Sequence, residues 1–224
     1  MTARPTIRFD EQPPPLRVDR ITLAVLPIDG FSGAIVRCGV GARIEGLPDK
    51  PIVNASGMLV FINLAPPPLP PHYRVVVKAS EAGFFDPQPL EFTPPAENDP
   101  EIEKKRKLTV LLVPRPDFPF PSGTTLVRGV AKRGGAPAAG IRVTARPPLS
   151  SARFETLTGD NGAFALALRP HPEGPVPLEL AIRFEDGNVL LRSLPGKRLV
   201  PGRSHSFRDP VDLNGLNDPD FFTI

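Results

Sequence analysis

The 224-residue sequence has no tryptophan, one tyrosine and one cysteine. A single cysteine excludes an intrachain disulfide, so the chain does not use the disulfide framework of small exported domains. The scarcity of tryptophan and tyrosine argues against a carbohydrate-binding surface, which would need exposed aromatic rings on a sheet face. No stretch approaches the ~20 apolar residues of a transmembrane helix. We therefore predict no membrane span.

Excess charge is scarce as well. The net charge is only +3, and the charged residues are spread evenly, without the clustered basic face that phosphate neutralisation requires. We predict no nucleic-acid partner. The basic run within residues 101–107 stands beside Glu101 and Glu103, which is typical of a solvated loop.

The residue types that bind metals or carry out catalysis are few and scattered. The three histidines, His72, His171 and His205, lie in separate segments rich in proline or glycine, with no partner three or four residues away. Metal and acid–base sites need donors that converge. We therefore predict no metal site, no cofactor and no catalytic residue, and hence no enzyme.

Other short motifs also lack residues that a metal-binding, catalytic or phosphate-binding site needs. Asp160-Asn161-Gly162 lacks the further acidic positions of a calcium loop. Ser150-Ser151 and Ser204-His205-Ser206 stand outside any Gly-x-Ser-x-Gly elbow. Gly134-Gly135 lacks the Lys-Ser/Thr of a phosphate-binding loop. We interpret the first as a turn that enters a strand and the last as a hairpin turn.

Proline is abundant, at 32 residues, and long uninterrupted helices are nearly excluded by it. Short strands joined by proline-rich loops fit this composition, so we predict an all-β protein. Cys38 lies on the apolar side of an alternating run, 36–44, with Ala42 and Ile44. We predict that it is a buried structural thiol.

The same unit, a turn followed by a strand, occurs twice along the chain. Asp160-Asn161-Gly162 precedes an alternating run with Phe164, Leu166 and Leu168 on one face, which predicts a turn into a half-buried strand. Asn54-Ala-Ser-Gly57 leads in the same way into Met58–Leu64. The repetition predicts two units of about 100 residues each, a size typical of single domains.

Alternating apolar residues predict the strands of both units. In the first unit they are 21–25, closed by a turn at 27–30, then 36–44, 58–64, 73–79 and 108–113. In the second they are 125–130, 141–146, 154–158, 163–168, 178–184 and 189–192, with hairpin turns at 133–137 and 185–188.

The predicted organisation is all-β, with two tandem β-sandwiches joined by a proline-rich linker. Its parts are an extended N-terminal arm at 1–16, a first sandwich at 17–113, a linker at 114–121, a second sandwich at 122–209 and a C-terminal tail at 210–224. The apolar end, Phe221–Ile224, is expected to dock on the second sandwich or on a partner.

Several of these segments resemble the carboxypeptidase regulatory-like domain. In the first unit they are Gly33-Ala-Ile-Val, the turn and strand from Asn54, and Tyr73-Arg-Val-Val-Val; in the second they are Gly140-Ile-Arg-Val and Thr158-Gly-Asp-Asn-Gly-Ala-Phe164. The resemblance implies two tandem Greek-key, transthyretin-like β-sandwiches, each with seven strands and generally non-catalytic. The chain departs from the family in a corner loop lengthened by prolines and in His171-Pro-Glu-Gly-Pro175, which replaces the second tyrosine corner.

The sequence thus favours a non-catalytic structural or interaction subunit that bridges protein partners, itself included, in a larger assembly. By analogy with the family, one such assembly is a phage-tail-like contractile injection particle. A soluble ligand- or carbohydrate-binding accessory module is the alternative. The first residues contain no apolar segment typical of a secretion signal, so we expect synthesis in the cytoplasm. This expectation is compatible with later release of the chain as part of a particle.

Overall fold

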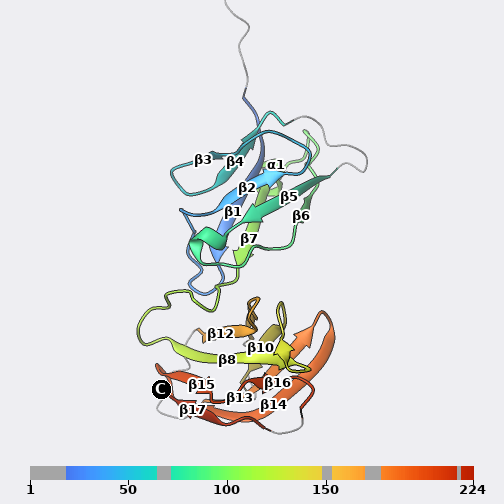
Figure 1. The fold of residues 1–224 in the computed structure, drawn as a ribbon. Coiled ribbons are helices and arrows are strands. Elements are labelled where there is room, and N and C mark those ends of the chain that lie inside the picture. Colours follow the sequence, from blue (N-terminus) through green and yellow to red (C-terminus); the bar gives the residue numbers. More distant parts are fainter. Residues whose placement is uncertain (1–18, 65–71, 148–152, 170–177, 216–217) are drawn as a thin grey trace, which may run out of the picture.

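The computed structural model describes residues 19–64, 72–147, 153–169, 178–215 and 218–224. These residues form four β-sheets and little helix, which confirms the predicted all-β fold (Figure 1). The predicted arm at 1–16, Ser150-Ser151 and His171 lie outside the described residues. The helices that are described are all too short to cross a bilayer.

The first half of the chain, residues 19–112, builds two sheets around one hydrophobic cluster. Their strand orders are β3-β4-β1-β7 and β2-β5-β6. Both sheets contribute to the cluster, for example through Leu23 and Phe61 from one and Val75 from the other. The elements are β1 (Ile21–Asp29), β2 (Gly41–Ile44), β3 (Ile52–Val53), β4 (Leu59–Ile62), β5 (Tyr73–Lys78), η1 (Ser80–Ala82), β6 (Leu90–Phe92), α1 (Ile102–Lys105) and β7 (Lys107–Leu112).

The second half, residues 125–224, repeats this arrangement with two more sheets and a second cluster. One sheet has the order β11-β10-β13-β14; the other has the order β12-β8-β15-β17, with β9 and β16 also paired to β8. The strands are β8 (Thr125–Arg133), β9 (Ala136–Pro137), β10 (Arg142–Arg146), β11 (Phe154–Leu157), β12 (Ala163–Leu168), β13 (Leu178–Asp186), β14 (Val189–Leu199), β15 (Ser204–Phe207), β16 (Val211–Asp212) and β17 (Phe221–Thr223).

The repeated turn and strand occupy the same place in both halves. β4 pairs antiparallel with β1, and β12 pairs antiparallel with β8. Each central strand is also paired in parallel on its other edge, β1 with β7 and β8 with β15. The asparagine of each turn caps it: the Asn54 side chain accepts from the Ser56 and Met58 amides, and Asn161 accepts from Ala163. The predicted turns before both strands are confirmed.

Two predictions for the first half are wrong. β1 does not turn at 27–30 but continues to Asp29, because the segment after the real turn pairs back on it, with the Val36 amide donating to the Pro27 carbonyl. Cys38 is exposed rather than buried. Gly39 adopts a left-handed φ of 71°, which breaks the alternation, so the strand starts only at Gly41.

At 101–107 the structure differs from the prediction, and at the C-terminal end it selects one of the two predicted docking sites. The expected loop at 101–107 contains the short helix α1, in which the Lys105 amide donates to the Glu101 carbonyl and the Lys104 ammonium lies 3.2 Å from the Glu101 carboxylate. The apolar C-terminal end docks on its own half: β17 pairs antiparallel with β15, and Phe221 packs against the second cluster.

We predict that Gly162→Ala destabilises the second half more than Gly187→Ala does. Both glycines have positive φ, which costs an alanine about 1–2 kcal/mol. A Cβ at Gly162 would also overlap the Ala131 carbonyl oxygen, whereas one at Gly187 meets nothing within 4 Å. Urea unfolding should show at least about 1 kcal/mol more destabilisation for Gly162→Ala, the overpacking cost. Equal losses would contradict the structure.

Candidate functional site, a cleft at the junction of the two halves

The segment predicted as a linker, 114–121, packs against the first half. Its Phe118 ring lies 5.1 Å from Phe84 and 5.1 Å from Phe120, measured between centroids, and Phe120 lies 5.3 Å from Phe31. The Arg115 amide donates to the Gly83 carbonyl at 2.9 Å. Four phenylalanines thus form a continuous chain of ring contacts at the base of the first half.

Two arginines of the second half hold this aromatic chain. The Arg128 guanidinium lies 5.9 Å from the centroid of Phe120, and its Nη1 donates to the Pro116 carbonyl at 2.8 Å. The Arg169 guanidinium lies 5.7 Å from the centroid of Phe31. Cation–π contacts of this kind contribute about 0.5–2 kcal/mol each. The halves are therefore joined by specific contacts in addition to the covalent chain.

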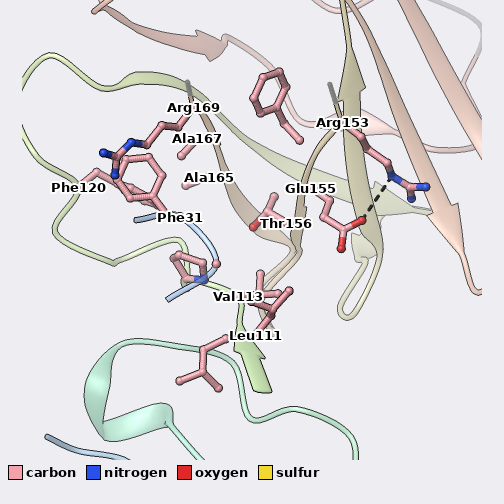
Figure 2. Close-up of a pocket in the computed structure, with 14 residues that line it drawn as sticks. Phe31, Leu111, Val113, Phe120, Arg153, Glu155, Thr156, Ala165, Ala167 and Arg169 are labelled. Atoms are coloured by element: carbon pink, nitrogen blue, oxygen red, sulfur yellow. Dashed lines mark ion pairs between the residues drawn. The ribbon is translucent and has the colours of Figure 1, made fainter. Parts of the chain in front are cut away.

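Beside these contacts lies a cleft of about 290 Å³, which we call the junction cleft (Figure 2). The ends of β1 and β7 form its wall on the first half, and β11 and β12 form its wall on the second. In Figure 2, Arg169 lies with Phe31 and Phe120 on one side of the cleft, and Arg153 and Glu155 lie on the other. The lining also includes Leu111, Thr156, Ala165 and Ala167.

The hydroxyl of Thr156 is buried in this lining without a hydrogen-bond partner among the described residues. The residue is 3% exposed, because the alternation of β11 turns it to the same side as the buried Phe154. An unsatisfied buried hydroxyl costs about 1–3 kcal/mol, so such groups are rare in stable proteins. The cleft therefore offers a polar group that a ligand can satisfy.

Two strand edges also open onto the junction cleft. β11 has β10 as its paired neighbour, and the Thr158 amide donates to the Ile141 carbonyl. Since successive residues of a strand point their backbone groups to opposite edges, the amide and carbonyl of Glu155 face the free edge. The same counting along β12 places the backbone groups of Ala165 and Ala167 on a free edge. The corresponding edge of β7 is occupied beside the cleft, where the Phe85 amide donates to the Val113 carbonyl.

The charged lining carries one uncompensated cation. Arg153 lies 3.4 Å from the Glu155 carboxylate and 3.7 Å from that of Glu185. Within the described ranges, no carboxylate forms an ion pair with Arg169, and its guanidinium donates only a long hydrogen bond there, 3.5 Å, to the Ser32 carbonyl. An anionic group placed in the cleft would be drawn to Arg169.

The two histidines that the structure describes, His72 and His205, do not converge. The His72 ring lies 3.9 Å from Glu91 in the first half. His205 is fully buried in the second half, where its Nε2 accepts from the Val200 amide at 3.0 Å. In the part of the chain that the structure describes, no group of three His, Cys, Asp or Glu residues is placed to hold a metal ion.

Sequence reasoning missed the junction cleft. The available signals were Thr156, a polar residue at an inward position of a strand, and Phe118 and Phe120 within a segment assigned to a linker. Neither signal shows which segments from elsewhere in the chain stand opposite. The cleft exists only because residues near 31, 111 and 156 meet in space.

We predict opposite outcomes for two buried threonines. Thr156→Val removes a hydroxyl that has no partner, so the free energy of unfolding should stay the same or rise by about 1 kcal/mol. Thr158→Val removes a hydroxyl that accepts from the Ile141 amide and donates to the Ala138 carbonyl, at 2.8 and 2.6 Å. It should cost about 1–3 kcal/mol in urea unfolding. A comparable loss in both variants would mean that Thr156 has a partner.

We also predict that Phe120→Ala loosens the junction while leaving both hydrophobic clusters intact. The variant removes ring contacts with Phe31 and Phe118 and the contact with Arg128. Limited proteolysis should cut within 114–123 several times faster, and small-angle scattering should report a larger radius of gyration. Unchanged cleavage would show that these rings do not hold the halves together. Phe222→Ala, in an exposed ring of β17, is the control.

Comparison with known proteins assigns no family. No protein-family model and no curated protein matches the chain. Matching solved structures include a streptococcal ancillary pilin, 13% identical with a TM-score of 0.26, where the match covers 90% of this chain but only 57% of the pilin. A Bacteroides ovatus protein provisionally assigned to cell adhesion is 10% identical with a TM-score of 0.25, and the match covers 93% and 97%. Similarities this low carry no argument about function.

Proposed function

We propose that this chain is a non-catalytic structural subunit that joins neighbouring proteins in an assembly. The observation that supports this most directly is the apolar outer face of the sheet β3-β4-β1-β7. The inner face of that sheet lines the first cluster, through Leu23, Phe61 and Val110. In a two-layer sandwich the other face normally carries polar residues, because it meets water.

Strand register shows which residues share this outer face. Ile52 is paired with Val60, which is paired with Ala24. Further along the central strand, Ile28 is paired with Leu111. The outer positions are thus apolar on β3, β4 and β1, while on β7 Leu111 shares the face with the polar Lys107 and Thr109.

The rim of the outer face is strongly exposed. Ile52 is 56% exposed, Leu111 is 66% exposed and Ile21, at the start of β1, is 49% exposed. In the middle of the face, Leu26 and Val60 are buried without belonging to either hydrophobic cluster. Exposed apolar side chains gathered on one face of a sheet favour an interaction surface.

The same proposal extends to a particle. Two sandwiches joined by packed aromatic rings give a long unit with different surfaces on its two halves, as a component that bridges neighbours requires. By the family resemblance, a phage-tail-like contractile injection particle is one such assembly; this placement is an analogy of architecture alone. The alternative carbohydrate-binding module would need open aromatic faces, whereas Phe31 and Phe120 pack edge to face against each other.

We predict that Ile52→Asp weakens association of the full-length chain. Covering an isoleucine contributes about 1.5–3 kcal/mol, so the dissociation constant should rise by a factor of about 10 to 100. The measurement is solution mass by light scattering over a concentration series. Leu190→Asp is the matched control, because Leu190 is 53% exposed but lies on β14 of the other half.

Two results would contradict the proposal. One is a wild-type chain that stays monomeric at every concentration and captures no partner. The other is an equal loss of association in Ile52→Asp and Leu190→Asp, which would point to a general effect of added charge.

A further inference from the structure

The junction cleft has the features of a receptor for an extended strand. Free backbone groups of Glu155 and Ala165 face it from two strands. Addition of a strand to such edges satisfies backbone donors and acceptors, while side chains alternate into flanking pockets. The methyl side chains of Ala165 and Ala167 leave room for larger side chains from outside.

The occupant is a short segment rather than a folded domain. At about 290 Å³, the cleft lies near the lower end of the ~300–1,000 Å³ that ligand pockets span. A complementary ligand would place a hydrogen-bonding group at Thr156, a carboxylate at Arg169 and apolar side chains against Leu111. An extended peptide of a few residues with alternating apolar and charged side chains supplies all three.

The chain contains such a segment near its start. Residues 6–11 read Thr-Ile-Arg-Phe-Asp-Glu, so Ile7 and Phe9 share one face of an extended strand. Arg8, between them, has the charge to meet Glu155. Asp10 and Glu11 follow with the carboxylates that Arg169 lacks. These residues lie outside the described ones, and their sequence alone supplies the match.

We propose that the junction cleft binds residues 6–11 of a second copy of this chain as an added β-strand. This inference rests on the proposed function, and it names the partner and the contact. Within one copy, the arm joins the chain at Asp19, before β1, whereas Gly30, after β1, lines the cleft. Nine strand residues, about 30 Å, separate the two ends of β1. The arm of the same copy would therefore have to run back along the length of β1 to reach the cleft.

The geometry of this contact determines the kind of assembly. The arm and the cleft are different surfaces, so after one contact the first copy keeps a free cleft and the second copy keeps a free arm. A reciprocal exchange of arms closes a two-fold dimer, whereas one-way contacts add copies head to tail into a ring or an open row.

Disulfide trapping between full-length chains tests the proposal. All chains carry Cys38→Ser, because Cys38 is exposed and would crosslink on its own account. One chain adds Phe9→Cys and another adds Glu155→Cys, whose side chain is 52% exposed. After mixing and mild oxidation, a non-reducing gel should show the mixed dimer forming at least about ten times faster than with the control.

The control partner carries Glu91→Cys in place of Glu155→Cys. Glu91 lies on β6, an edge strand of the first half, and its side chain is 75% exposed. Equal crosslinking to both positions would overturn the assignment of the cleft. A chain with both Phe9→Cys and Glu155→Cys that links only within itself, with no mixed dimer, would overturn the second copy as the occupant.

Failure here is distinguishable from failure of the proposed function. If the mass rises with concentration and falls in Ile52→Asp while no trapping occurs in the cleft, the outer face is the assembly surface and the cleft proposal is wrong. If trapping is specific while Ile52→Asp has no effect, the cleft holds the copies together and the outer face does not.

Discussion

Each half of the molecule depends on one strand that is hydrogen-bonded along both edges. β1 lies between β4 and β7, and β8 lies between β12 and β15, each with one antiparallel and one parallel neighbour. The backbone of a strand paired on both sides has no groups left for a partner. Free edges are therefore left at the outer strands of the sheets, and among these β11 and β12 line the junction cleft.

The same constraint explains how Pro27 is tolerated inside β1. Proline cannot donate to a ladder, so it is rare in central strands. The amides of Ala24 and Gly30 donate toward β7, and by alternation the backbone of Pro27 faces the other edge. β4 no longer pairs there; its place is taken by the segment near Val36, whose amide needs only the Pro27 carbonyl. The proline that suggested a turn therefore occupies a position where no amide is required.

Sequence patterns predicted the fold where burial of one face dominates. Leu180, Ile182 and Phe184 alternate and are fully buried, and Tyr73 and Val77 behave in the same way. The patterns failed where a long-range pairing decides the outcome, as at 27–40. There the left-handed Gly39 and the return pairing on β1 override the local alternation that placed Cys38 inside.

The junction cleft lay beyond sequence reasoning for a related reason. The proline-rich composition of 114–121 indicated a stiff spacer. That interpretation considered only the backbone and left out the phenylalanine side chains. Apolar rings in a spacer are unfavourable in water, so they pack where a surface is near, and Phe118 and Phe120 find one in Phe84 and Phe31. That packing brings the end of β7 to the edge of β11 and leaves the hydroxyl of Thr156 facing the gap between them.

The outer face and the cleft differ in what symmetry they permit. A flat apolar face can pair with itself about a two-fold axis, which closes a dimer and then stops. A cleft that accepts a segment of another copy closes a dimer when two copies exchange arms, and it propagates when each arm enters a further copy. With one-way contacts, a subunit that has both surfaces can extend in one direction through arms and clefts and join such rows sideways through faces. Because the contacts of Arg128 with Phe120 and of Arg169 with Phe31 link the two halves, they also set the angle between those directions, so the junction determines the shape of such an assembly.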